Sequence, residues 1–134
     1  MSINASDVER AWAAGLFEGE GCFSTVRSLR SHGRVALRAS LGMTDEDTVR
    51  RFHAIVGVGA IHVRHRAGVK SHWIWQVHTI EGFRHVFGLL EPWLGDRRRA
   101  RATELIVERD EYESRKPAIR AAAARASGAT RRAA

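Results

Sequence analysis

The chain of 134 residues has little of several residue types that restrict function. It contains one cysteine, Cys22, two prolines and two lysines. A single cysteine excludes an internal disulfide and argues against a structural zinc site built from several thiolates. No apolar run approaches the roughly 18 residues of a membrane-spanning helix, and residues 1–9 lack the charged-then-apolar order of a signal peptide. We therefore expect a soluble protein that is not secreted and does not act at a membrane.

The composition that is present fits one globular domain with a basic excess. Hydrophobic residues make up 44% of the chain and charged residues 28%, which suits a modest core and excludes a wholly disordered or fibrous chain. Lys and Arg number 22 against 15 Asp and Glu, a formal net charge of +7, and the isoelectric point is near 11.1. This balance points to a polyanionic partner, although net charge alone does not separate nucleic acid from a membrane surface or from simple solubility.

Hydrophobic periodicity predicts an α+β fold in the order α-β-β-α-β-β-α-α. Capping boxes at Ser6 and Thr44 should begin the first two helices, and Gly57 should end the second. The strands should form one curved four-stranded antiparallel sheet with the helices on one face. The expected elements are a helix over 7–20, strands over 23–26 and 35–41 with a turn at 31–33, a helix over 44–56, strands over 61–66 and 72–77, and helices over 83–90 and 96–113.

The composition changes sharply near the end of the chain. From Pro117 onward the residues are mainly Ala and Arg, no acid is present, and bulky apolar side chains are almost absent. Such a segment buries too little surface to hold itself in place. We expect residues 1–116 to form the folded domain and residues 117–134 to form a basic, disordered tail.

Small residues line one face of the first predicted helix. Ala11, Gly15 and Gly19 lie four residues apart and therefore stack on one side. Glycine inside a helix costs about 1 kcal/mol relative to alanine, so two of them indicate that another backbone approaches closely. A neighbouring helix or a bulky core side chain of the same chain could fill this groove. No second segment repeats the stripe, so an identical helix would have to come from a second copy across a two-fold axis.

Two carboxylates end the same helix, where the negative end of the helix dipole disfavours acidic side chains. Glu18 and Glu20 both break this rule, which indicates a cation nearby. Residues two apart on a helix point in nearly opposite directions, so the two carboxylates do not serve one site from regular helix. Glu20, between Gly19 and Gly21, is the better ligand for a hard divalent cation such as Mg²⁺. Glu18 is assigned a structural or supporting role, and a plain solvated carboxylate is the alternative for Glu20.

The residues around this helix end resemble a known motif. The sequence AAGLFEGEGCF over 13–23 is similar to the LAGLIDADG motif of homing endonucleases, in the variant that ends D/E-G-E-G-C-F. The strand pairs, the Gly57-Val58-Gly59 turn and the sequence PWLGDR over 92–97 fall where the single-motif members have their counterparts. The resemblance covers residues 8–113 of the chain and carries with it the LAGLIDADG homing-endonuclease fold.

The resemblance implies a two-fold homodimer that hydrolyses one phosphodiester bond in each strand of double-stranded DNA, at a long pseudo-palindromic site. Glu20 matches the family's catalytic metal ligand, the carbonyl of Gly19 would lie beside the same ion, and Arg97 matches the basic residue that approaches the site. Glu18 would act behind this first layer of residues. The expected cofactor is Mg²⁺, with Mn²⁺ as a substitute, and no small-molecule cofactor is implied. The motif helices would form the dimer interface through Ala11, Trp12, Gly15, Leu16 and Gly19.

Two features depart from the family's pattern. Arg97 stands where lysine is commoner, and arginine stabilises phosphate charge without shuttling protons. Leu41, Gly42 and Met43 stand near the end of the second strand, where a polar residue, often glutamine, is usual. These departures support an alternative, a non-cleaving nucleic-acid-binding protein of the same fold that serves as a transcriptional regulator or an RNA-splicing maturase. A third reading is a basic protein whose charge serves only solubility.

The outward side of the predicted sheet is polar and basic, and DNA is its expected partner. Arginine suits guanine edges and phosphates, glutamine suits adenine, and small apolar groups suit the thymine methyl. An ordinary solvated sheet face is the alternative. The two strand pairs, over 21–44 and 57–78, hold seven basic residues and no acid. The expected DNA-binding residues are Ser24, Val26, Ser28, Arg30, Arg34, Arg38, Ser40, His62, Arg64, Arg66, His72, Ile74 and Gln76.

The resemblance and composition also suggest a biological setting. Arginine supplies 20 of the 22 basic residues, which favours a bacterial or phage gene. We expect a cytoplasmic protein. Family membership implies mobility of an intron or intein, although a free-standing gene fits the sequence equally well.

Overall fold

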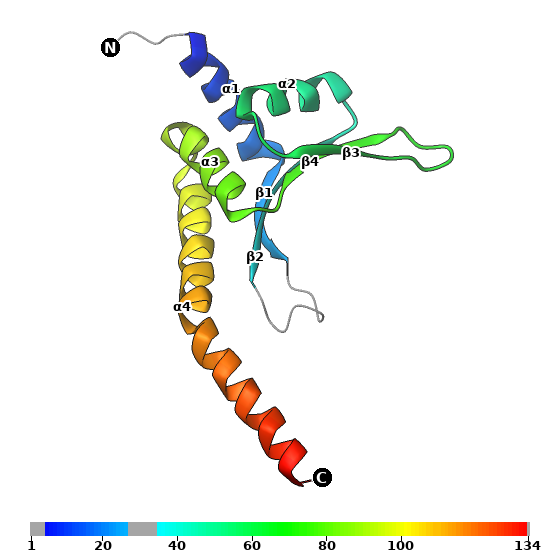
Figure 1. Ribbon diagram of the computed structural model, residues 1–134. Coiled ribbons are helices and arrows are strands. Elements are labelled where there is room, and N and C mark those ends of the chain that lie inside the picture. Colours follow the sequence, from blue (N-terminus) through cyan, green and yellow to red (C-terminus); the bar gives the residue numbers. More distant parts are fainter. Residues whose placement is uncertain (1–4, 27–34, 134) are drawn as a thin grey trace.

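The computed structural model describes residues 5–26 and 35–133. The element order is α1 (Ala5–Glu20), β1 (Gly21–Val26), β2 (Ala36–Met43), α2 (Glu46–Val56), β3 (Ala60–Arg64), β4 (His72–Val77), α3 (Ile80–Leu90), the 3-10 turn η2 (Glu91–Trp93) and α4 (Asp96–Ala133). The predicted α+β order is confirmed, including the interruption at Pro92 between the last two helices (Figure 1). The turn predicted at 31–33 lies outside the described residues.

The four strands form one antiparallel sheet in the order β1-β2-β4-β3. Leu41 of β2 lies at the centre, paired with Gly21 of β1 on one side and Trp75 of β4 on the other. Trp75 also pairs with Ile61 of β3, an edge strand. Since successive side chains point to opposite faces of a sheet, this register separates a buried face from an outward face. The buried face carries Phe23, Leu37, Ala39, Leu41, Trp75 and Val77.

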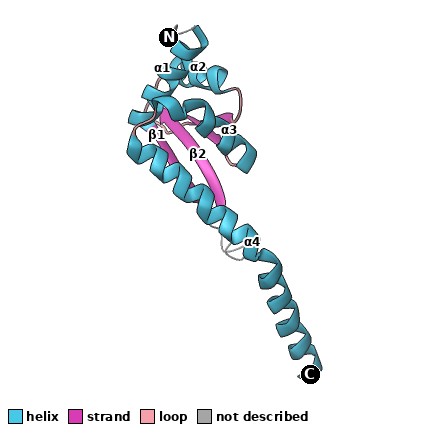
Figure 2. Cartoon of the chain, turned by 90° about the vertical axis from the view of Figure 1, so that its left-hand side faces the viewer, coloured by secondary structure: helices cyan, strands magenta, loops and turns pink. Residues whose placement is uncertain are grey.

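Aromatic side chains join the helices to the buried face of the sheet. Phe17 of α1 lies 4.6 Å from Phe23 of β1 between ring centroids, and Phe52 of α2 lies 4.8 Å from Trp75 of β4. Phe83 of α3 completes the cluster at 5.2 Å from Phe23. All five rings are almost fully buried, and each contributes on the order of 2–3 kcal/mol through the apolar area it removes from water. The core therefore lies between α1, α2, α3 and one face of the sheet. In Figure 2, α4 passes in front of β1 and β2 on this helical side.

The ends of α2 are set by specific caps. The carboxylate of Asp45 accepts a hydrogen bond from the Thr48 backbone N–H at 3.4 Å and another from its hydroxyl at 2.9 Å. Asp45 is therefore the N-cap, one residue after the Thr44 that the sequence pattern predicts. Gly57 ends the helix at φ 72° and donates its N–H to the carbonyl of His53, as predicted. A turn in this left-handed conformation strains residues other than glycine.

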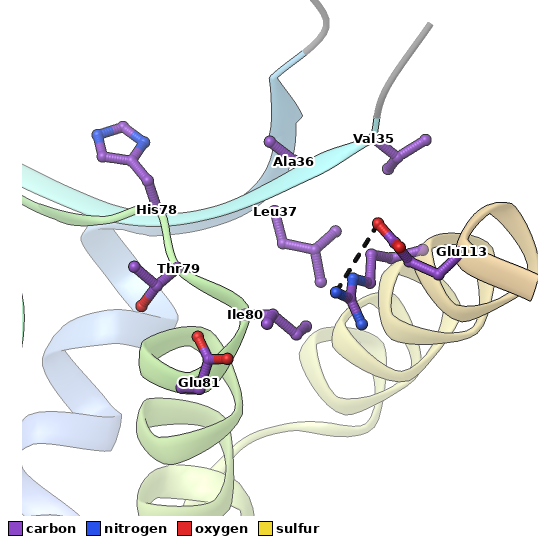
Figure 3. Close-up of a pocket in the computed structure, with 9 residues that line it drawn as sticks. Val35, Ala36, Leu37, His78, Thr79, Ile80, Glu81 and Glu113 are labelled. Atoms are coloured by element: carbon purple, nitrogen blue, oxygen red, sulfur yellow. Dashed lines mark ion pairs between the residues drawn. The ribbon is translucent and has the colours of Figure 1, made fainter. Parts of the chain in front are cut away.

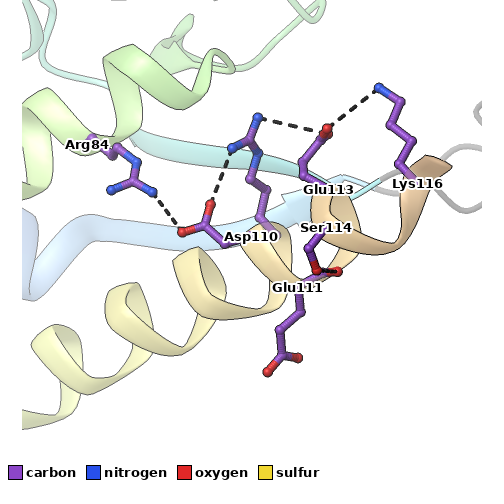
Figure 4. Close-up of polar contacts among 7 residues, drawn as sticks. Arg84, Asp110, Glu111, Glu113, Ser114 and Lys116 are labelled. Atoms are coloured by element: carbon purple, nitrogen blue, oxygen red, sulfur yellow. Dashed lines mark hydrogen bonds and ion pairs between the residues drawn. The ribbon is translucent and has the colours of Figure 1, made fainter. Parts of the chain in front are cut away.

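The last helix is anchored to the body at its middle. Arg84 of α3 pairs with Asp110 of α4 at 2.9 Å, while Glu113 receives Lys116 at 3.6 Å and Arg109 at 3.9 Å (Figure 4). Inward-facing Ala102 and Leu105 on the same helix are fully buried. The Arg84–Asp110 pair and the buried Ala102 and Leu105 hold α4 against the body of the molecule, whereas the pairs of Glu113 lie within α4 itself.

The length of α4 differs from the sequence prediction. The pattern predicts a helix that ends near residue 113 and a disordered tail from residue 117, whereas the helix runs on to Ala133 with Pro117 inside it. Pro117 lacks the N–H that would bond to the carbonyl four residues earlier, a loss that the Ala-rich sequence after it tolerates because alanine has the highest helix propensity. The side chains described between 117 and 127 are all exposed, and this end of α4 projects away from the sheet in Figures 1 and 2. The division into a domain over 1–116 and a separate segment over 117–134 stays a prediction.

Within the described residues, no helix has the length and apolarity needed to cross a bilayer.

Candidate active site and nucleic-acid surface

The end of α1 presents one free carboxylate. Glu20 is the last residue of the helix and is exposed, as is Gly19 before it. Within residues 5–26 and 35–133 no side chain forms an ion pair or hydrogen bond with the Glu20 carboxylate, and no three metal-ligating side chains gather anywhere. A carboxylate and an adjacent backbone carbonyl are oxygen donors of the kind that Mg²⁺ and Mn²⁺ accept. These two oxygen donors are of the kind that a divalent ion accepts, and the described residues bring no group of three metal-ligating side chains together there.

Glu18 is held in a structural role. One of its carboxylate oxygens accepts a hydrogen bond from the backbone N–H of Gly95 at 2.6 Å, just before α4 begins. A Cβ on Gly95 would lie 3.2 Å from the same oxygen, so a side chain there would press on this contact. Glu18 thus ties the end of α1 to the start of α4 and leaves the exposed position to Glu20.

Arg98 is the functional-site residue that the sequence pattern does not reveal. Its guanidinium donates to the carbonyl of Glu18 at 2.9 Å and to the carbonyl of Gly21, and it lies 5.8 Å from the centre of the Phe17 ring. A cation at a helix C-terminus offsets the negative end of the helix dipole. The sequence predicts a cation near the two glutamates that end α1. For Glu18, that cation is Arg98. The run of three arginines from Arg97 to Arg99 was the available signal, but sequence alone does not tell which of the three points inward.

Arg97 lies where the sequence prediction places it, at the start of α4 and beside the motif. Its side chain is exposed and lines a hollow of about 410 Å³ together with Gly21, Cys22, Arg98 and Arg101. These three arginines make a strongly positive wall beside Gly21, the residue that follows Glu20. Cys22 lines the same hollow from β1 and is exposed; in the part of the chain that the structure describes, the only hydrogen-bond partner of its thiol is the carbonyl of Phe23, at 3.7 Å.

The small-residue face of α1 is open in the single chain. A Cβ built on Gly15 or Gly19 meets nothing within 4 Å, while Ala13, Ala14 and Phe17 on the opposite side of the helix are fully buried. The open face is bordered by Ala11, Trp12 and Leu16, which are partly buried, and by Val8, which is 57% exposed. Within residues 5–26 and 35–133, no helix of the same chain fills this groove at Gly15 or Gly19. Val8 lies about two helical turns before Gly15, on the same side of α1. It was not among the expected interface residues.

Most of the expected DNA-binding residues lie together on the outward face of the sheet. Arg38, Ser40, His62, Arg64, Ile74 and Gln76 line a single hollow of about 310 Å³ on the side of the sheet opposite the core. A second hollow of about 320 Å³ lies beside it and is lined by Thr44, Arg64, Arg66, Val69, Lys70 and His72. Ser24, which accepts a hydrogen bond from Arg38 at 3.4 Å, and Val26 continue this face along β1. Ser28, Arg30 and Arg34 lie outside the described residues.

Another hollow, on the helical side, differs in character. It encloses about 340 Å³ between the start of β2, the start of α3 and α4, and Figure 3 shows Glu81 and Glu113 on its walls. Arg109 faces the same space but is paired with Glu113 at 3.9 Å. Carboxylates repel phosphate, so this hollow is no part of a nucleic-acid surface.

Comparison with known proteins supports the fold without close sequence relatives. No family model matches the chain, and no curated protein matches it. Solved structures do match, and those described below are homing endonucleases. I-CvuI, in complex with the I-CreI target in the presence of Mg with DNA not cleaved, matches with a TM-score of 0.65 and 20% identity over 83% of this chain and 71% of that chain. The chain has the LAGLIDADG homing-endonuclease fold.

Further structures with this fold agree. I-GzeII in complex with its DNA target matches with a TM-score of 0.63 and 21% identity over 87% of this chain and 39% of that chain. I-TnaI matches with a TM-score of 0.62 and 17% identity over 90% of this chain and 84% of that chain. The chain spans 63% of the I-CvuI chain bound to its Sro1.3 target in the presence of Ca, and between 38% and 84% of the chains overall. The predicted resemblance to LAGLIDADG proteins is thereby confirmed at the level of the fold.

Proposed function

We propose that this LAGLIDADG-fold chain is a homodimeric, metal-dependent endonuclease that cuts double-stranded DNA at a long pseudo-palindromic site. The observation that carries the proposal is the position of Glu20. Glu20 is exposed at the end of α1, one residue after Gly19 of the open face and one residue before Gly21, which lines the arginine hollow of α4. Several structures of the same fold are DNA complexes of homing endonucleases. Intron or intein mobility belongs to the same proposal.

The dimer brings together two incomplete metal sites. Gly19 and Glu20 lie at the end of the open face of α1, so packing two such faces places both Glu20 carboxylates near the two-fold axis. Glu20 and the carbonyl of Gly19 would hold Mg²⁺ or Mn²⁺ there. A bound divalent ion polarises the phosphate and lowers the pKa of a water molecule.

The chain's own residues bind and orient the substrate. Arg97 and Arg101 present positive charge beside Glu20, where they stabilise the additional negative charge that develops on the phosphate during hydrolysis. The outward face of the sheet, with Arg38, Arg64 and Gln76, reads base edges and phosphates in the major groove. Arg98 and Glu18 fix the backbone that carries Glu20.

The Glu20→Gln variant tests the proposal. A duplex is first selected from a randomised library by binding to the wild-type protein in Ca²⁺ and is then incubated with protein in Mg²⁺. We expect wild type to cut both strands, EDTA to abolish cutting and Mn²⁺ to restore it. Glu20→Gln should lose cutting by at least about a thousandfold, because the amide is a poor ligand for the ion, while duplex affinity changes by less than about threefold.

Glu81→Gln is the matched control. It removes an exposed carboxylate from the helical side of the molecule and should cut at the wild-type rate. Specific binding of the selected duplex by wild type without any nick would contradict the proposal and favour the non-cleaving nucleic-acid-binding alternative. Cutting by Glu20→Gln would place the metal site elsewhere.

A further inference from the structure

The histidine at the start of β4 lies over a glycine of β2. A Cβ built on Gly42 would come within 2.6 Å of Nε2 of His72, closer than real Cβ atoms approach such an atom. The imidazole therefore occupies the space above the Gly42 backbone that a side chain would otherwise fill. Both residues belong to the outward face, since Leu41 and Trp75, in the opposite alternation, are buried. Only glycine at 42 allows the ring to lie in this position.

The register of β1 and β2 places the same glycine beside the end of α1. Gly21 of β1 pairs with Leu41 of β2. Because the two strands are antiparallel, Glu20, the residue before Gly21, and Gly42, the residue after Leu41, lie at the same end of this strand pair. Residues opposite each other in an antiparallel pair have Cα atoms about 5 Å apart. An imidazole above Gly42 is thus within reach of a substrate group held at the Glu20 carboxylate.

The His72 ring also borders the basic part of the outward face. It lines the hollow of about 320 Å³ that contains Arg64, Arg66 and Lys70. These three cations suit a phosphate of the DNA backbone, so a nucleic acid held there would pass close to His72. Among the residues that the structure describes, no hydrogen bond or ion pair holds the ring nitrogens of His72. The ring is exposed and available to a substrate or a water molecule.

We propose that His72 is the polar group that positions the attacking water at the Glu20 site, in the place left vacant by Gly42. This inference rests on the proposed nuclease function. In the step concerned, a ring nitrogen of His72 accepts a hydrogen bond from the water. The water oxygen forms a bond to phosphorus, the bond from phosphorus to the leaving ester oxygen breaks, the water gives up a proton to solvent, and the leaving oxygen takes a proton from solvent.

Two substitutions at different positions should have the same effect. His72→Ala removes the ring, and Gly42→Ala displaces it, because the added methyl group occupies the position of Nε2. Each should lower the single-turnover cleavage rate of the selected duplex in Mg²⁺ by at least about tenfold, on the scale of one hydrogen bond lost in the transition state. Affinity for the duplex in Ca²⁺ should change by less than about threefold. The double variant should be no slower than His72→Ala, since both changes remove one interaction.

A conservative variant and a control separate positioning from folding. His72→Gln keeps a side-chain oxygen that accepts a hydrogen bond and should recover most of the rate. His78→Ala removes another exposed histidine, one residue after β4, and should cut like wild type.

Each outcome decides the inference. Equal rates for wild type and His72→Ala would overturn it while the nuclease function stands. A loss that appears only in duplex affinity would reduce His72 to a DNA contact and also overturn it. A wild-type protein that binds but does not nick would overturn the nuclease function and this inference together.

Discussion

At the scale of single residues, Arg98 is the residue at the site that we expect to contribute most to the free energy of unfolding. Its side chain is 18% exposed, it donates to the carbonyls of Glu18 and Gly21, and its Nε is buried without a hydrogen-bond partner. Hydrogen bonds from a charged donor contribute roughly 1.5–3 kcal/mol each, so we expect Arg98→Ala to lower the free energy of unfolding by about 3 kcal/mol. Arg98→Lys should recover part of this loss, because an ammonium does not match two carbonyls as the guanidinium fork does. The exposed neighbour supplies the control: Arg97→Ala should change stability by less than about 0.5 kcal/mol. Urea denaturation followed by circular dichroism measures all three, and equal losses for Arg97→Ala and Arg98→Ala would contradict this account.

At the scale of elements, α1 has one face for its own core and a second face that the chain leaves open. A Cβ at Gly15 meets nothing, and the same is true of Gly88, an exposed glycine of α3. Replacing either glycine by leucine should therefore raise monomer stability by about 0.5–1 kcal/mol, since leucine favours the helix. If two α1 helices pack through the open face, Gly15→Leu separates them and abolishes the dimer, whereas Gly88→Leu leaves it intact. Sedimentation equilibrium at micromolar concentration distinguishes the two variants. A Gly15→Leu protein that remains dimeric would show that α1 is not the interface.

The same elements show what the sequence could predict and what it could not. Alternation of apolar and polar residues was sufficient for the strands, because one face of the sheet is buried and the other is not. The glycines at 15 and 19 marked this face of α1 but did not decide whether the same chain or a second copy covers it. The partners across long separations were not predictable, since a pattern of residue types carries no information on which side chain of α4 turns back to the end of α1. Glu18 meeting Gly95, and His72 meeting Gly42, arise from such tertiary contacts. The helix beyond Pro117 was missed because the composition argument weighs burial and ignores the high helix propensity of alanine.

At the scale of the whole molecule, basic residues lie on the outward face of the sheet and in the part of α4 after Pro117. The role of this second group in DNA binding can be tested. Residues 117–134 carry Arg120, Arg125, Arg131 and Arg132 and no acid, and the side chains described over 117–127 are exposed. A protein ending at residue 116 should unfold at the same urea concentration as the full chain, because the side chains described over 117–127 bury no contact with the body of the molecule. Its affinity for duplex DNA should fall, and the slope of log Kd against log salt should decrease by up to about 3.6 per chain, or about 0.9 for each phosphate contact removed. Fluorescence anisotropy between 50 and 200 mM KCl, roughly the range over which such contacts weaken most visibly, measures both slopes. Unchanged slopes would show that the arginines after Pro117 make no phosphate contact, while a destabilised truncated protein would show that the domain extends beyond residue 116.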